Sequence, residues 1–268
     1  MICLNNIQIG IVGCGQMGQG IARVCALVDY KVLLYDSFEG EAERAGNVLL
    51  DKVPSASLQI AKSLNDLSDC GLVIEAIKED YVIKQKLFKN LSDINSSGIL
   101  ATNTSSLSIQ RLAQVVKNPE RFIGLHFMNP VQVMPLIEVI AGKLTSTHTI
   151  DQTLDFCKSI GKIVIQCQDQ PGFIVNRLLL PMINQAIYAL ESGLASAEDI
   201  DTAMKLGSGV PMGPLALADF IGLDTCLSIL QVLYAEGKNL TFPPNGLLIQ
   251  KVKQGQLGKK TKQGFFTY

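Results

Sequence analysis

The sequence lacks the cysteine spacing of metal-binding and disulfide-rich proteins. Its seven cysteines include no C-x-x-C pair and their number is odd, so neither a zinc site nor a disulfide framework is predicted. This cysteine usage is typical of a reducing compartment, and we expect a cytoplasmic protein. Histidine is also scarce, because the chain of 268 residues contains only two. Any histidine-based chemistry therefore rests on one or both of them.

Runs of like charge and long uninterrupted apolar segments are absent as well. The formal net charge is −1, which argues against a nucleic-acid or membrane surface and favours a small-molecule partner. The first residues, MICLNNIQIG, lead into an apolar strand without a charged region and a cleavage site, so we expect no export signal. The most apolar later segment, residues 173–190, falls short of a membrane span and is predicted as a core or interface helix. Its interruptions are Asn176, Arg177, Pro181, Asn184 and Gln185.

Short apolar runs rich in valine and isoleucine alternate with helix-length segments in the first part of the chain. This alternation is typical of a parallel, doubly wound sheet with helices on both faces, and the predicted fold class is α/β. After DQPGF at 169–173 the strand pattern stops and helical periodicity continues. We therefore predict a nucleotide-binding domain over residues 1–168 and a smaller all-α domain over residues 169–268. The predicted strands are IQIGIVG, KVLLYD, LVIEAI, GILATN, RFIGLHF and KIVIQC.

A glycine-rich loop follows the first predicted strand and opens a helix, with G-x-G-x-x-G at Gly13, Gly15 and Gly18. The first glycine allows a tight turn, the second lets the backbone approach a pyrophosphate, and the third lets the helix pack against the strand. The phosphates then lie at the positive end of the helix dipole. The loop, which also carries Gln16 and Met17, indicates a Rossmann-type dinucleotide site, although glycine turns without a ligand are common.

The second predicted strand ends in Asp36, at the offset where a carboxylate accepts hydrogen bonds from the adenosine ribose hydroxyls. Residues 37–39 supply no arginine for a 2′-phosphate, and Glu39 would repel one. NAD is therefore predicted as the cofactor rather than NADP. The alternative reading of Asp36 is a solvated carboxylate at a strand end.

One of the two histidines, His126, lies near the carboxyl end of a late predicted strand, where ligands bind in this architecture. A neutral imidazole there can take the proton from a substrate hydroxyl while hydride leaves for nicotinamide. Glu138 lies within the apolar run MPLIEVI, where a carboxylate is costly unless it is paired, and a pair would raise the basicity of the imidazole. The residues alone equally allow a structural histidine, with Glu138 facing solvent from an edge strand. His148, in a polar turn, is predicted at the surface.

A set of motifs in order along nearly the whole chain resembles the L-3-hydroxyacyl-CoA dehydrogenase family, including its bacterial 3-hydroxybutyryl-CoA members. The resemblance implies an NAD-dependent oxidoreductase of fatty acid metabolism that interconverts a 3-hydroxyacyl thioester and its 3-oxoacyl form. It also implies that His126 is the general base and that Glu138 holds it. The motifs are GxGxMGxGIA, NTSS, HFMNP, MPLIEVI, PGFIVNR, DTAMKLG, PMGPLAL, GLD and GKKTKQGFF.

The same resemblance assigns further site residues. Ser105 of NTSS hydrogen-bonds the substrate oxygen and Asn176 of GFIVNR helps to polarise the carbonyl, so both join the catalytic group. Residues implied as neighbours of the cofactor are Glu79, Lys84, Ser105, Asn129 and Lys260. For the charged residues among them, a solvated helix face or tail charge is the alternative.

One departure from the family concerns the segment between the Asp36 strand and LVIEAI. The family usually inserts a long helical hairpin there that contacts CoA, and this chain has only a short segment. The acyl group then rides on CoA with fewer contacts, is carried by an acyl carrier protein, or is a free hydroxy acid. A non-catalytic NADH-binding sensor is a further alternative. The apolar helices of residues 169–268 and the resemblance both predict a homodimer through that domain.

Overall fold

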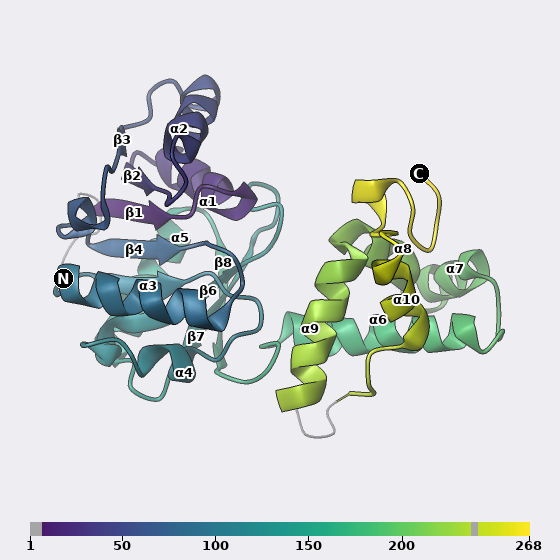
Figure 1. Ribbon diagram of the computed structural model, residues 1–268. Helices are drawn as coiled ribbons and strands as arrows, with labels where there is room; N and C mark the ends of the chain where they lie inside the picture. The colour runs from purple at the N-terminus through teal and green to yellow at the C-terminus, as the bar shows by residue number, and fades with distance from the viewer. Residues whose placement is uncertain (1–6, 237–240) are drawn as a thin grey trace. The chain divides into compact units, whose positions relative to one another are not determined.

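The computed structural model describes residues 7–236 and 241–268 (Figure 1). The chain divides into two compact units, one that ends at Gln170 and one that begins at Pro171. The expected boundary lay after residue 168. The first six residues, which carry part of the expectation about export, lie outside the described residues.

The first unit is built on an eight-stranded sheet in the order β3-β2-β1-β4-β5-β6-β7-β8. Strands β1 to β6 are parallel, and the order reverses between β1 and β4, which places a ligand-binding crevice at their carboxyl ends. The predicted Rossmann-type doubly wound sheet is therefore confirmed. The strands are β1 Gln8–Val12, β2 Lys31–Tyr35, β3 Leu58–Ile60, β4 Leu72–Glu75, β5 Ile99–Thr102, β6 Phe122–Phe127, β7 Leu136–Ala141 and β8 Ile163–Gln168.

The parallel pattern that the sequence predicts has an exception at β7, which runs antiparallel to β6. The connection between them, residues 128–135, is too short for the crossover that a parallel neighbour requires, so the chain reverses direction. Strand β8 then pairs in parallel with β7 and forms the edge of the sheet.

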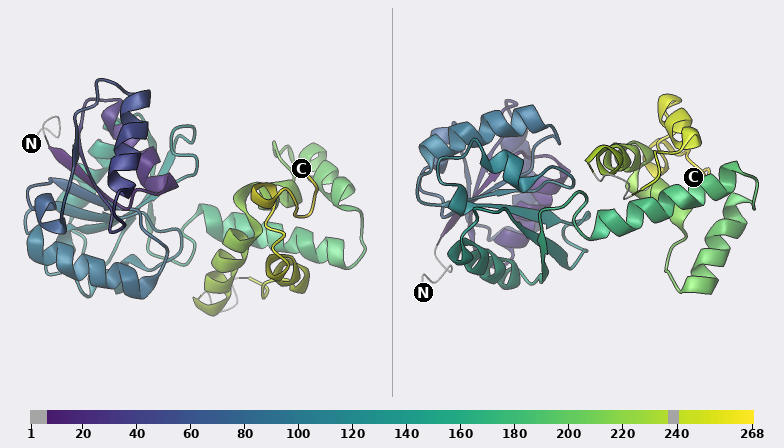
Figure 2. Two further views of the ribbon diagram at one scale, coloured as in Figure 1. Left: turned by 45° about the horizontal axis from the view of Figure 1, so that its top comes forward. Right: turned by 90° about the horizontal axis from the view of Figure 1, so that it is seen from below.

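Helices cover both faces of the sheet, with α3 on one side and α5 on the other in the right-hand view of Figure 2. Helices α1, α2 and α5 share one apolar core with alternate strand residues such as Ile9, Ile11 and Val139. On the opposite face the ring of Phe88 from α3 meets that of Phe122 from β6, with centroids 4.7 Å apart. The helices are α1 Gln16–Ala26, α2 Glu41–Lys52, α3 Tyr81–Ile94, α4 Ile109–Ala113 and α5 Thr147–Ser159.

The short segment between β2 and β4 folds as α2, the three-residue strand β3 and a 3-10 turn at Leu64–Leu67. Helix α2 has 12 residues and packs beside β3 and α1. Its inner face buries Ala42, Ala45 and Leu49 in the core of the first unit. The segment therefore forms an ordinary layer of the Rossmann-type fold.

The regular elements of the second unit, in the residues that the structure describes, are helices, as the sequence predicts. Helix α6 contains most of the apolar segment 173–190 and buries Leu180, Ile183 and Ile187 in the core of this unit, which confirms a core helix. The carboxyl-terminal segment returns to α8, because Asp219 accepts hydrogen bonds from the chain around Phe265. The helices are α6 Val175–Glu191, α7 Ala197–Ser208, α8 Pro214–Ile221, α9 Leu223–Glu236 and α10 Gly246–Lys253.

No single helix of the described residues combines the length and the apolarity needed to cross a bilayer. Helices α8 and α9 pass such a test only when they are joined, and they are bent by 100° at the break between them.

Candidate active site

The glycine loop has the geometry that its spacing predicts. Gly13 adopts φ of +96°, which favours glycine, and a Cβ on Gly18 would lie 1.8 Å from the Gly13 carbonyl oxygen. The loop and the start of α1 therefore fit together only without side chains at these two positions. A Cβ on Gly15, in contrast, would have no protein atom within 4 Å. The open space beside Gly15 suits the close approach of a dinucleotide pyrophosphate.

Asp36 follows β2 and lies against this loop. Its carboxylate accepts hydrogen bonds from the backbone N–H groups of Cys14, at 2.7 Å, and Phe38, at 3.0 Å. Two oxygens offer about four acceptor positions, so the carboxylate retains capacity for ribose hydroxyls. The neighbouring Glu39 is exposed, in keeping with an unsuitable setting for a 2′-phosphate.

Other residues expected near the cofactor lie next to the same loop. The side-chain amide of Gln16 donates to the side-chain oxygen Oδ1 of Asn129 at 3.1 Å, which joins the start of α1 to the segment after β6. Met17 is half-buried and packs against the core of the first unit, so its contact with the protein is structural. The structure thus gathers Gln16, Asn129 and Asp36 around one loop.

His126 and Glu138 form a buried pair on neighbouring strands. They are direct partners in the register of β6 and β7, and His126 Nδ1 lies 2.7 Å from a Glu138 carboxylate oxygen. His126 is 5% exposed and Glu138 is fully buried, so the alternative of an edge-strand carboxylate in solvent is wrong. Because a carboxylate only accepts, Nδ1 carries the proton and Nε2 is the basic nitrogen of the neutral ring.

The loop that carries Ser105 is held by Glu79. One oxygen of that carboxylate accepts from the hydroxyl of Thr104 at 2.5 Å and from the backbone N–H of Ser105 at 2.9 Å. Burial by itself would raise the pKa of Glu79, but Lys84 and these hydrogen bonds outweigh burial and lower it. Glu79 therefore stays ionised beside Ser105.

Lys84 is fully buried, so the alternative of a solvated helix face is wrong for this residue. Its ammonium group contacts Glu79 and also Glu75, the last residue of β4. Sequence reasoning missed Glu75. The signal that points to it is an acidic residue at the end of the apolar strand LVIE, with a lysine nine residues further along a helix.

Two of the expected site residues belong to the second unit. Asn176 lies in the first turn of α6 and is 9% exposed. Lys260 forms an ion pair with Asp224, with Nζ 2.6 Å from a carboxylate oxygen. Their roles toward substrate and cofactor stay predictions.

The cysteines and the remaining histidine do not add to this site. Burial, with Asp36 as a smaller cause, raises the pKa of Cys14 to about 12, so this thiol of the glycine loop is not a nucleophile at neutral pH. His148 is exposed, as predicted, although it lies in the first turn of α5 rather than in a loop. Among residues 7–236 and 241–268, no three His, Cys, Asp or Glu side chains converge as metal ligands would.

A Rossmann-type sheet, an open glycine loop with an acidic partner, and a buried histidine–carboxylate pair on the same sheet are together typical of an NAD-dependent dehydrogenase. Comparison with known proteins agrees with this class. The model of the 3-hydroxyacyl-CoA dehydrogenase NAD-binding domain matches residues 8–170, and that of the 3-hydroxyacyl-CoA dehydrogenase C-terminal domain matches residues 172–268.

Individual relatives cover nearly the whole chain. A 3-hydroxybutyryl-CoA dehydrogenase of Bradyrhizobium diazoefficiens is 46% identical, over 97% of this chain and 95% of the relative. One of Clostridioides difficile is 42% identical, over 98% of this chain and 99% of the relative. The crystal structure of (S)-3-hydroxybutyryl-CoA dehydrogenase from Ralstonia eutropha superposes with a TM-score of 0.91 at 41% identity, over 98% of this chain and 99% of that one. The chain therefore belongs to the 3-hydroxyacyl-CoA dehydrogenase family, and it is an NAD-dependent oxidoreductase that interconverts 3-hydroxyacyl and 3-oxoacyl groups.

Proposed function

We propose that this enzyme acts on short 3-hydroxyacyl-CoA thioesters, with 3-hydroxybutyryl-CoA and acetoacetyl-CoA as the pair to test first. The names of its relatives support the four-carbon acyl group and the CoA carrier. The observation that carries the chemistry is the hydrogen bond between His126 and Glu138 at the carboxyl end of β6.

In the oxidative direction, His126 Nε2 takes the proton of the C3 hydroxyl as the C3–H bond breaks and the carbonyl forms. Bound NAD⁺ supplies the acceptor for the hydride, and thus for both electrons. Glu138 stabilises the imidazolium that results, because its carboxylate accepts a hydrogen bond from the Nδ1–H. Ser105 hydrogen-bonds the substrate oxygen, and the family resemblance assigns the same task to Asn176. In the reductive direction the imidazolium returns the proton to that oxygen.

The test is the oxidation of NADH by the purified chain with acetoacetyl-CoA, followed by the loss of NADH absorbance. We expect saturable turnover and formation of the (S)-3-hydroxy product. NADH binding without turnover of any 3-oxoacyl compound would contradict the proposal.

A different carrier is the second candidate, and the shortened segment after β2 favours it. Between β2 and β4 this chain has only helix α2, the short strand β3 and a 3-10 turn, where the family resemblance implies a longer hairpin that contacts CoA. The alignment with the Bradyrhizobium enzyme spans 278 positions, whereas this chain has 268 residues, so the relative contains residues that this chain lacks. Fewer contacts to CoA weaken the advantage of that carrier over an acyl carrier protein or a free acid.

A rate panel decides between the carriers. The same 3-oxo acyl group is offered on CoA, on acyl carrier protein and as the free acid, and the values of kcat/KM are compared. We expect CoA to be preferred. A higher kcat/KM for the carrier protein or the free acid would establish the alternative instead.

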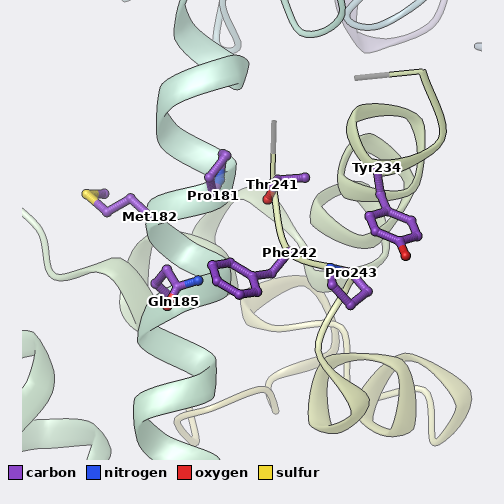
Figure 3. Close-up of a pocket in the computed structure, with 7 residues that line it drawn as sticks. All are labelled: Pro181, Met182, Gln185, Tyr234, Thr241, Phe242 and Pro243. Atoms are coloured by element: carbon purple, nitrogen blue, oxygen red, sulfur yellow. The ribbon is translucent and has the colours of Figure 1, made fainter. Parts of the chain in front are cut away.

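We also propose a homodimer through the second unit. Its surface carries a hollow of about 590 Å³ between α6, α9 and residues 241–243, lined mostly by apolar side chains with the polar Gln185 and Thr241 among them (Figure 3). Phe242, which lines the hollow, is 63% exposed. Leu178, on α6, is 70% exposed. Apolar surface of this kind supports association with a second copy of the chain.

Sedimentation at micromolar concentration tests the dimer. We expect a particle of twice 29.0 kDa, and Leu178→Glu should shift it toward the monomer. Leu206→Glu is the matched control, since Leu206 on α7 is 83% exposed and no residue of α7 lines the hollow. A wild-type particle of 29.0 kDa would contradict the dimer.

The cytoplasm is the compartment that we propose. The six cysteines of the described residues are free thiols, as a reducing compartment keeps them. Fractionation of cells that express the chain, followed by immunodetection, tests this proposal.

A further inference from the structure

Glu75 is a fully buried carboxylate whose hydrogen-bonding capacity is filled. Lys84 Nζ lies 2.8 and 2.9 Å from its two oxygens. The hydroxyl of Thr102, its partner in the register of β4 and β5, donates at 2.6 Å, and the backbone N–H of Ile77 donates at 2.7 Å. A buried charge persists only with such partners, so Glu75 has no spare position for a ligand.

The ammonium group of Lys84 is also surrounded by hydrogen-bond partners. An ammonium group has three protons to donate, and three carboxylate oxygens surround this one: both of Glu75 and one of Glu79, the last at 3.1 Å. Lys84 lies in the first turn of α3, and Asp80 caps the start of that helix. The contacts of the ammonium group within the protein are therefore all to carboxylate oxygens of Glu75 and Glu79.

The other oxygen of Glu79 acts on the loop after β5. Besides Thr104 and Ser105, it accepts from the backbone N–H and the hydroxyl of Ser106, both at 3.2 Å. Glu79 is therefore held on one side by Lys84 and holds the 104–106 loop on the other. The side chain is 33% exposed, which leaves it at the rim of the buried pair.

The same loop is tied to the strand of the catalytic histidine. The side-chain carbonyl of Asn103 accepts from the backbone N–H of Phe127 at 3.0 Å, and Phe127 directly follows His126 on β6. The 103–106 segment thus has two anchors, one at Glu79 and one beside His126.

We propose that Glu75 and Lys84 are positioning residues, which fix Glu79 and through it the loop that presents Ser105 to the substrate beside His126. The inference rests on the proposed function, since Ser105 matters here as a ligand of the substrate oxygen.

The test uses the double variant Glu75→Gln/Lys84→Met in the full-length enzyme. It replaces the buried ion pair by neutral side chains of similar size, which the fold tolerates better than removal of one partner. With the loop released, we expect kcat to fall about 10- to 100-fold. The Kd of NADH should change by a smaller factor than kcat, and the pH profile of kcat should keep its shape.

Hydrogen exchange gives a readout that does not depend on turnover. The amides of Ser105 and Ser106 lose their carboxylate acceptor, so we expect their exchange to accelerate about 10- to 100-fold. Glu79→Ala should accelerate the same amides, and it leaves the buried pair of Glu75 and Lys84 in place, so it covers the case in which the double variant does not fold.

Non-additivity separates positioning from a general loss of stability. If Glu75 and Lys84 act through Glu79, adding their two substitutions to Glu79→Ala should cause no further loss of kcat. Lys86→Met is the matched control, because Lys86 is exposed on the same helix, and it should behave as the wild type.

Two results would overturn the inference. One is a raised NADH Kd with unchanged kcat in the double variant, which would make Lys84 a direct cofactor ligand. The other is unchanged amide exchange at Ser105 and Ser106. Inactivity of the wild type toward every 3-oxoacyl compound would instead count against the proposed function, and the exchange experiment would still decide whether the loop is held as inferred.

Discussion

His126 and Glu138 face each other across an antiparallel strand pair, with Nδ1 and a carboxylate oxygen 2.7 Å apart. They are twelve residues apart in the chain and directly opposed in the sheet. The short reversal between β6 and β7 creates this opposition, because a parallel β7 would place Glu138 in another register. The proposed catalytic pair is thus a consequence of the antiparallel pairing of β6 and β7.

The first prediction concerns the base itself. His126→Gln keeps a polar side chain of similar reach but removes the basic nitrogen, so kcat should fall about 100- to 10,000-fold, the usual contribution of a general base. The Kd of NADH, measured by fluorescence titration, should stay near the wild-type value. His148→Gln is the control, since His148 is exposed. Full activity of His126→Gln would remove His126 from the mechanism.

The second prediction concerns the partner of the base. Glu138→Gln preserves size and one acceptor oxygen but removes the charge that stabilises the imidazolium. We expect kcat to fall about 10- to 100-fold, as for other residues that orient a catalytic or ligating histidine. The exposed Glu120 supplies a matched control in Glu120→Gln. Wild-type kcat in Glu138→Gln would show that the pair is structural only.

The fold and part of the site follow from the sequence because they depend on local patterns. The glycine spacing predicts the turn at Gly13 and the close contact at Gly18, since both are properties of one strand-turn-helix unit. Asp36 follows from the end of the next strand. Such features require no knowledge of contacts between distant segments.

The contacts that the sequence does not reveal all join distant segments. The residues alone left the pairing of His126 with Glu138 open, because spacing does not determine the direction of β7. Lys84 reads as a surface charge of a helix until the packing of α3 on the sheet places it between Glu75 and Glu79. The bond between Gln16 and Asn129 spans 113 residues and has no local signal.

The third prediction separates two glycines of the same loop. Gly15→Ala should fold like the wild type, since Gly15 has φ of −69° and its added Cβ meets no protein atom within 4 Å. The methyl group would occupy the space of the pyrophosphate, so the NADH Kd should rise about 10- to 100-fold, the cost of overfilling a close contact.

Gly18→Ala should destabilise the fold itself, before any effect on NADH binding. Its Cβ would lie 1.8 Å from the Gly13 carbonyl oxygen, so α1 must shift from β1, and we expect a lower midpoint of thermal unfolding even without cofactor. If Gly15→Ala binds NADH as the wild type does, the pyrophosphate does not lie against Gly15.

The fourth prediction is a pH dependence of stability at the carboxyl terminus. The Tyr268 hydroxyl donates to Asp219 at 3.1 Å, and burial together with the Asp219 carboxylate raises the pKa of Tyr268 from 10.0 to about 12. The folded state therefore holds this proton more tightly than the unfolded state. The resulting stability is fully present below pH 10.0 and is lost as the pH rises toward about 12.

Tyr268→Phe removes this contribution and its pH dependence. At neutral pH the variant should unfold with a free energy lower by about 1 kcal/mol, the net value of one hydrogen bond. Between the two pKa values the difference from the wild type should shrink, because only the wild type loses stability through this hydroxyl. Urea unfolding at neutral pH and at a pH between the two pKa values measures the difference. Tyr234→Phe is the control, at a residue that is 52% exposed. A difference that stays constant with pH would show that Tyr268 does not titrate as its contact with Asp219 requires.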